Sequence, residues 1–126
     1  MEKLIFFVDD DKMILNLLDY TFNNREGIKV KTFSTGEKCL ASLNESPDLI
    51  ILDHSFALGD TNFSNGFEVL EKIQEINKNM PVIVLSGERD EKVVSDYMKH
   101  GVMKFIMKDS FFIDSLMETI KEKFNS

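Results

Sequence analysis

The sequence has little that would support an extracellular, membrane-spanning or nucleic-acid-binding protein. It contains a single cysteine, Cys39, so no disulfide can form within the chain, and a reducing cytoplasm is the expected location. No apolar run approaches the roughly 20 residues that a membrane helix needs. Fifteen basic residues stand against twenty-two acidic ones, which gives a net charge of −7. Nucleic acid and anionic membrane surfaces are therefore not expected as partners.

The composition is that of an ordinary globular protein. Of the 126 residues, 43% are apolar and 29% are charged. The chain is long enough to bury one core and too short for two. It shows no internal repeat and no linker, so we expect a single domain over residues 1–126.

Apolar runs and amphipathic stretches alternate five times along the chain. Strands are predicted at residues 3–8, 28–33, 49–53, 81–86 and 102–107. Helices are predicted from just after Asp11 to about 23–24, from 34 to about 44, from 65–66 to 76, around 93–98, and from 109–110 to 124.

The composition of the predicted strands indicates their order. The first, third and fourth are uniformly apolar, as buried central strands are, whereas lysines dilute the second and fifth. Right-handed crossovers then favour the order 2-1-3-4-5, a doubly wound parallel sheet of five strands in an α/β fold with five helices.

Polar residues mark several helix boundaries. The Ser34 hydroxyl and the Glu37 side chain have the spacing of a capping box. Asp11 is expected to cap the first helix, and Asp109 or Ser110 the last. The apolar stripe of the third helix is predicted to extend to its end, Ile76, and Cys39 is expected to be a small buried helix residue.

Four of the predicted strands end in polar groups. Asp53 closes one apolar run, Asp9 and Asp10 follow the first strand, and Ser86 and Lys108 follow the fourth and fifth. Because the carboxyl ends of parallel strands meet at one edge of the sheet, we expect these side chains to lie together.

Clustered carboxylates repel one another, and a hard divalent cation such as Mg²⁺ makes such a cluster tolerable. The cation also prepares Asp53 to act as a nucleophile that forms an aspartyl phosphate. Ser86 can then donate a hydrogen bond to the phosphoryl group, and Lys108 can supply a positive charge. Taken singly, Ser86 could simply begin a turn and Lys108 could be an edge-strand solubility residue. The combination is much harder to attribute to chance.

Five motifs stand at the ends of the predicted strands and at the start of the third helix: Val8-Asp9-Asp10, Leu52-Asp53, Asn65-Gly66-Phe67-Glu68-Val69-Leu70, Leu85-Ser86-Gly87 and Phe105 to Lys108. Through these motifs the chain resembles, over essentially its whole length, the receiver domain of bacterial two-component response regulators. This resemblance implies a flavodoxin-like fold and phosphorylation of Asp53 from the phosphohistidine of a histidine kinase or phosphotransfer protein. It implies that Asp10 and Asp53 bind Mg²⁺ directly, that Asp9 binds it through water, and that the Ser55 carbonyl completes the site.

The resemblance also implies how the signal is transmitted. Ser86 and Lys108 would bind the phosphoryl group, and Phe105 would be the switch aromatic. The partner surface would comprise the fourth helix, fifth strand and fifth helix, and no output domain is expected. The protein would be a monomer or a phosphorylation-dependent dimer, with no enzymatic activity beyond its own phosphorylation and dephosphorylation. Residues expected on the partner surface are Tyr97, Met98, Lys104 and Phe111.

Two segments depart from the family pattern. The segment from His54 to Asn65 is several residues longer than usual and lacks the family's Met-Pro. Because residues 57–65 offer little to bury, we expect this loop to be mobile without metal. Asp109 replaces the proline that normally follows the lysine, so a trans peptide, or an unusually constrained one, is expected there.

Three alternatives differ in function class. A flavodoxin shares the strand order but needs phosphate-binding hydroxyls and amides where this chain has three aspartates. A metal-dependent phosphohydrolase of the common aspartate-nucleophile kind needs a second acid at the position of Ser55. The third is a receiver-like binding module that is never phosphorylated, and the complete set of Asp10, Asp53, Ser86 and Lys108 argues against it.

Overall fold

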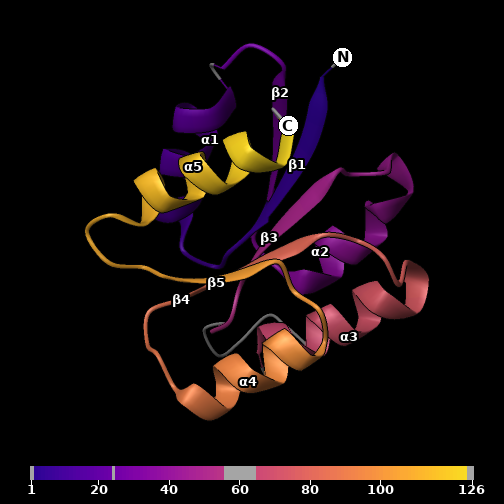
Figure 1. Ribbon diagram of the computed structural model, residues 1–126. Coiled ribbons are helices and arrows are strands. Elements are labelled where there is room, and N and C mark those ends of the chain that lie inside the picture. Colours follow the sequence, from indigo (N-terminus) through magenta and orange to yellow (C-terminus); the bar gives the residue numbers. More distant parts are fainter. Residues whose placement is uncertain (1, 24, 56–64, 125–126) are drawn as a thin grey trace.

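A parallel sheet of five strands runs through the middle of the molecule, with helices on both faces (Figure 1). The computed structural model describes residues 2–23, 25–55 and 65–124. The loop that was predicted to be mobile falls almost entirely on residues 56–64, outside the described residues. The strands are β1 (Lys3–Val8), β2 (Ile28–Phe33), β3 (Leu49–Asp53), β4 (Val82–Ser86) and β5 (Lys104–Met107). The helices are α1 (Lys12–Asn23), α2 (Gly36–Ala41), α3 (Gly66–Ile76), α4 (Glu91–Lys99) and α5 (Phe112–Phe124).

The strand order is β2-β1-β3-β4-β5, all parallel, which confirms the predicted fold. Val8 pairs with both Phe33 and Leu52, so the first three strands end at nearly the same level. Ser86 pairs with Met107 at the end of the other half of the sheet. The register therefore brings the polar groups that follow these strands to one edge.

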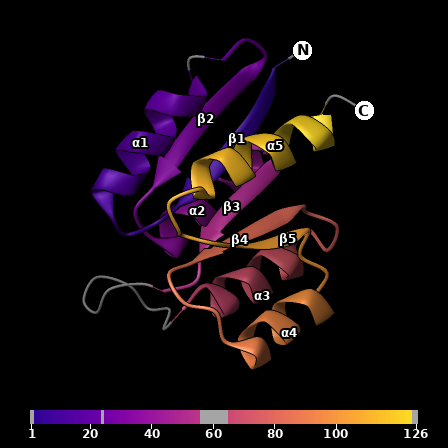
Figure 2. The ribbon, with the colours of Figure 1, turned by 60° about the vertical axis from the view of Figure 1, so that its left-hand side comes forward.

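Each face of the sheet has its own core. Helices α1 and α5 cover one face, and α2, α3 and α4 cover the other (Figures 1 and 2). Along β1, Phe6 and Val8 belong to the core beneath α2, α3 and α4, whereas Ile5 and Phe7 belong to the core beneath α1 and α5. This two-sided burial explains why the central strands are uniformly apolar.

The helix starts are partly as predicted. Asp11 caps α1, because its Oδ1 accepts hydrogen bonds from the amides of Met13 at 2.9 Å and Ile14 at 3.4 Å. The cap of α2 is Thr35 rather than Ser34, since Thr35 has the extended backbone and its hydroxyl accepts from Lys38 N. The carboxylate of Asp109 accepts from the amide of Phe111 at 2.8 Å and so shapes the turn that leads into α5.

Several boundaries differ from the prediction. Helix α2 ends at Ala41, and a short 3-10 turn, Leu43–Glu45, follows it where the helix was expected to continue. Strand β5 begins at Lys104, two residues late. Ile76 is 62% exposed, because the buried stripe of α3 ends one turn earlier, at Ile73. None of the helices in the described parts of the chain has the length and apolarity to cross a membrane.

Candidate functional site

The polar strand ends surround a cavity at the carboxyl edge of the sheet. The cavity has a volume of about 450 Å³. Asp9 and Asp53, at the ends of β1 and β3, are 1% and 2% exposed, so their carboxylates are almost out of contact with water. The residues lining the cavity are Asp9, Asp10, Asp11, Asp53, Ser55, Gly87, Glu88 and Lys108.

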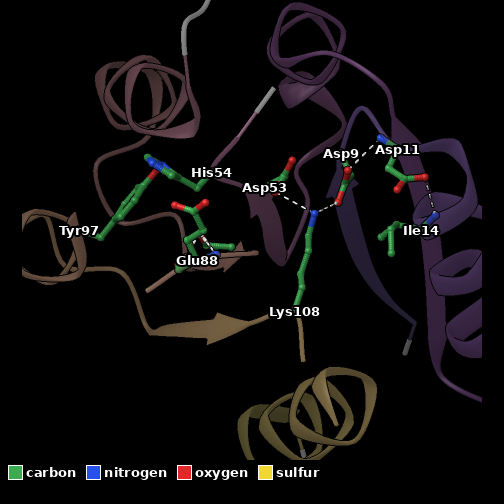
Figure 3. Close-up of polar contacts among 9 residues, drawn as sticks. Asp9, Asp11, Ile14, Asp53, His54, Glu88, Tyr97 and Lys108 are labelled. Atoms are coloured by element: carbon green, nitrogen blue, oxygen red, sulfur yellow. Dashed lines mark hydrogen bonds and ion pairs between the residues drawn. The ribbon is translucent and has the colours of Figure 1, made fainter. Parts of the chain in front are cut away.

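Lys108 reaches into this edge from the end of β5. Its Nζ lies 2.8 Å from Asp9 Oδ2 and 2.9 Å from Asp53 Oδ1, so one ammonium bridges the two buried carboxylates (Figure 3). The chain between Lys108 and Asp109 is trans, since the described residues contain no cis peptide. The aspartate that stands in place of the family's proline therefore still allows the lysine to enter the site.

The charges in this cluster are not balanced. Burial raises the pKa of Asp9, and burial followed by the charge of Asp9 raises the pKa of Asp53 to about 7. Burial alone would lower the pKa of Lys108, but its contacts with Asp9 and Asp53 outweigh burial and raise it. Burial is the main cause for the two acids, and one ammonium cannot neutralise three carboxylates, so the pKa values of Asp9 and Asp53 stay above their usual range while the lysine stays charged.

The donor set has the chemistry of a site for a hard cation. Asp9, Asp10 and Asp53 can each offer a carboxylate oxygen, and these oxygens all lie within 4.8 Å of one another. Asp9 Oδ2 and Asp53 Oδ1 are buried and accept no hydrogen bond of good geometry from the described residues, and both are within ion-pair distance of the Lys108 ammonium. Oxygen ligands of this kind suit Mg²⁺ and Ca²⁺.

The other predicted site residues lie near the cluster in different ways. Ser55 is exposed, lines the cavity and forms an isolated antiparallel bridge with Asn65. The hydroxyl of Ser86 donates to the carbonyl of Glu88 at 2.7 Å and accepts from the Glu88 amide at 3.2 Å, so it shapes a turn, and Ser86 is not among the residues that line the cavity. Phe105 is 9% exposed and packs inward, beside Tyr97.

Tyr97 was expected on the partner surface, and this expectation is wrong. Its side chain is 0% exposed and points inward from α4, and its hydroxyl lies 2.5 Å from His54 Nδ1 (Figure 3). The sequence already indicated that Tyr97 is buried, because it follows Val93 and Val94 at helical spacing on the apolar side of α4. His54, directly after Asp53, was not recognised as its partner, since nothing in the sequence links two residues 43 positions apart.

Gly66 was part of a recognised motif, but the structure gives the physical reason for it. A Cβ at this position would lie 2.3 Å from the Asp53 carbonyl oxygen, 3.0 Å from His54 Cα and 3.1 Å from the Tyr97 hydroxyl. The first turn of α3 therefore presses directly on the backbone of Asp53. Only glycine allows that approach.

Residues 5–121 match the response regulator receiver domain family. The chain belongs to this family. It is 35% identical to the alkaline phosphatase synthesis transcriptional regulatory protein PhoP of Bacillus subtilis. This match extends over 92 residues, which are 72% of this chain and 36% of that protein. The first curated relatives are longer, and the matches span 36% to 45% of their lengths.

Solved structures agree with this assignment. A CheY-like receiver domain protein from Methanospirillum hungatei has a TM-score of 0.85 and 29% identity, covering 99% of this chain and 95% of that one. The phosphorylated cyanobacterial phytochrome response regulator RcpA has a TM-score of 0.80 and 27% identity, covering 100% and 96%. The predicted family and fold are thereby confirmed, and the chain is a receiver domain with a phosphoacceptor role in signalling.

Proposed function

We propose that this receiver domain accepts a phosphoryl group on Asp53 from the phosphohistidine of a histidine kinase or phosphotransfer protein. The observation that carries the proposal is the position of Asp53, a buried carboxylate at a cavity edge with the Lys108 ammonium 2.9 Å away. A carboxylate attacks phosphorus only when it is ionised. Burial raises the pKa of Asp53 and the Lys108 ammonium lowers it, and the resulting pKa of about 7 leaves a substantial fraction ionised near neutral pH.

Mg²⁺ is the cation that we propose for the acidic cluster. Asp10 and Asp53 would bind it directly, Asp9 through water and Ser55 through its backbone carbonyl. When bound, the ion supplies positive charge that offsets the charge of an incoming phosphoryl group. The unbalanced carboxylates described above support this assignment, because a divalent cation and the Lys108 ammonium together carry three positive charges against three negative ones.

Two side chains would act after phosphorylation. Ser86 would turn its hydroxyl from the Glu88 carbonyl to an oxygen of the phosphoryl group, and Lys108 would hold another oxygen by charge. Phe105, now packed inward, would be the aromatic whose position follows that of Ser86. The hydrogen bonds of Ser86 to Glu88 support this role, since moving the hydroxyl releases the turn before α4.

The signal would leave through the surface formed by α4, β5 and α5. Met98 and Phe111 on this surface are 48% and 68% exposed, and Lys104 is exposed as well. We propose a protein partner there, or a second copy of the domain after phosphorylation, and no contact with nucleic acid through this domain. A cytoplasmic location and the absence of turnover on outside substrates belong to the same proposal.

Intact-mass measurement tests the proposal. The domain is incubated with Mg²⁺ and acetyl phosphate, and the expected result is the gain of one phosphoryl group that is abolished by Asp53→Asn. Asp114→Asn is the matched control, because it makes the same chemical change at an exposed position on α5. Labelling that persists in Asp53→Asn contradicts the assignment of Asp53. An unlabelled parent favours the binding module that is never phosphorylated, and turnover of a generic phosphate ester favours the phosphohydrolase.

A further inference from the structure

Helix α4 is attached to the rest of the domain through very few residues. Of its nine residues, Glu91 to Lys99, Tyr97 is the only one that is buried. Val93 and Val94 are half-buried and pack against the same core, and the exposed side of the helix includes Met98. The position of α4 on the sheet therefore depends strongly on how Tyr97 is held.

Tyr97 is held at both its ring and its hydroxyl. The ring packs against Phe67 of α3 and Phe105 of β5, with centroid separations of 5.3 and 5.9 Å. The hydroxyl lies 2.5 Å from His54 Nδ1 and is confined by the backbone near Gly66. Burial, followed by the charge of Asp53, raises the pKa of the Tyr97 hydroxyl, so this phenol already senses the charge on Asp53. A displacement of α4 along the sheet must break the contact with His54.

His54 in turn is fixed to the strand that carries Asp53. Its amide donates to the Leu85 carbonyl of β4 at 2.8 Å, and its carbonyl accepts from the Gly66 amide at 2.7 Å. His54 directly follows Asp53, so a change in the backbone at Asp53 moves the imidazole. The path from Asp53 to α4 thus consists of one peptide bond and one side-chain hydrogen bond, and Figure 3 shows the His54 ring meeting the Tyr97 hydroxyl.

We propose that the hydrogen bond between His54 and Tyr97 is a tether that holds α4 in the position seen here and transmits the state of Asp53 to this helix. His54 and Tyr97 are positioning residues, and neither touches the phosphoryl group. The inference rests on the proposed function in one respect, that phosphorylation is what changes the state of Asp53. Weakening the tether loosens α4, and a change at Asp53 loosens it in the same way.

Hydrogen exchange along α4 measures the tether directly. Tyr97→Phe removes one hydroxyl and keeps the ring, and loss of one net hydrogen bond predicts exchange of the α4 amides that is about 2- to 10-fold faster. Tyr20→Phe, the same change at a side chain that is 76% exposed on α1, should leave α4 unaltered. Equal exchange in Tyr97→Phe and the parent would overturn the tether.

Variants of His54 change the other partner of the same hydrogen bond. His54→Leu should accelerate α4 exchange as Tyr97→Phe does, whereas His54→Asn keeps a polar atom close to the position of Nδ1 and should restore most of the protection. The double variant His54→Leu/Tyr97→Phe should be no faster than either single variant, because both remove one shared interaction. Additive effects would mean that the two residues act independently, which contradicts the proposal.

Tyrosine fluorescence tests the link to Asp53. The chain has no tryptophan and two tyrosines, so Tyr20→Phe leaves Tyr97 as the only strong emitter. Beryllofluoride with Mg²⁺, a stand-in for the phosphoryl group, should change the Tyr97 emission in this background. When His54→Leu is added to this background, the Tyr97 emission without beryllofluoride should already differ from that of Tyr20→Phe. The further change on adding beryllofluoride with Mg²⁺ should be smaller.

The outcomes separate this inference from the proposed function. Labelling of Asp53 is followed by intact mass in every variant, and it should persist in Tyr97→Phe, which leaves Asp53 and Lys108 in place. A parent that is never labelled overturns the proposed function and with it the transmission from Asp53, and the exchange experiment then decides whether α4 is tethered. A labelled parent whose Tyr97 emission is unaffected by beryllofluoride leaves the proposed function standing and overturns the transmission.

Discussion

Asp53 lies between two buried neighbourhoods that differ in charge. On one side are Asp9 and the Lys108 ammonium, with more negative than positive charge and with carboxylate oxygens that lack well-formed hydrogen bonds. On the other side are the rings of His54 and Tyr97, which are joined by a hydrogen bond and packed against other aromatic side chains. The negative charge of the first neighbourhood is balanced only when a cation or a proton binds, whereas the side chains of the second are already hydrogen-bonded and packed.

This difference indicates what each neighbourhood responds to. Charge in the first changes with pH and with cations, because burial in a medium of low dielectric makes every unpaired carboxylate unfavourable. The second contains no unpaired polar group among the atoms described and leaves no free space near Gly66, so it responds to shape. One chain position, Asp53, is in contact with both.

The largest predicted effect comes from adding volume to the second neighbourhood. Gly66→Ala places a Cβ 2.3 Å from the Asp53 carbonyl oxygen, where backbone must shift. We expect a loss of about 3 kcal/mol in the free energy of unfolding, despite the better helix propensity of alanine. Gly87→Ala is the control, because a Cβ there meets nothing within 4 Å, and it should stay within about 0.5 kcal/mol. Chemical denaturation of both variants measures the difference, and equal stabilities would contradict the close approach.

The next effect is a dependence of stability on pH in the first neighbourhood. The pKa of Asp53 is raised from 3.8 to about 7 in the folded protein, so between these values the folded state binds a proton that the unfolded state does not. The contribution of Asp53 to stability without metal therefore rises as the pH falls from 8 to 6, by about 1.4 kcal/mol, or roughly 4–7 °C in the melting temperature. Burial lowers the pKa of His54, which opposes part of this rise near pH 6.5.

Asp53→Asn removes the titrating group and should flatten this part of the stability curve. The raised pKa of Lys108 does not oppose the trend, because its contribution is fully present below 10.5 and is lost only at higher pH. Thermal melts of the parent and the variant in metal-free buffer make the comparison. An equal change in melting temperature from pH 8 to 6 in the parent and in Asp53→Asn would show that Asp53 does not carry the shift.

The smallest effect comes from removing one charge from the acidic cluster. Asp10 lies beside Asp9 and Asp53, and its charge raises the pKa of both. Asp10→Asn should therefore stabilise the metal-free protein by about 1 kcal/mol and reduce its response to Mg²⁺. At ten times the dissociation constant, Mg²⁺ stabilises the parent by about 1.4 kcal/mol. A metal-free variant that melts below the parent, or an equal response of both to Mg²⁺, would mean that Asp10 is not a metal ligand.

Much of the fold follows from local patterns in the sequence. Uniform apolar runs predicted the central strands correctly, because a strand covered on both faces has no position for a polar side chain. Asp11 was correctly predicted to cap α1, since capping depends on residues only two or three positions away. Helix ends were less accurate, and α2 and β5 each differ from the prediction by two or more residues.

The sequence predicted which residues of the candidate site meet at the edge of the sheet. The sequence placed Asp9, Asp53 and Lys108 at one edge, because parallel strands with right-handed crossovers must end together, and the structure has them in contact. The direction of a side chain was not predictable in the same way. From its position the Ser86 hydroxyl could have been expected in the cavity, but in the structure it forms hydrogen bonds with the backbone of Glu88.

By itself, then, the sequence determined the order of the strands, the edge at which the acids meet and the family, since these depend on periodicity and on residues that lie next to strand ends. Only the tertiary structure decided that Tyr97 points inward, that its hydroxyl meets His54 and that Gly66 presses on Asp53. These contacts join β3, α3 and α4 across long sequence separations. The packing of three elements sets these contacts, and no local pattern carries that information.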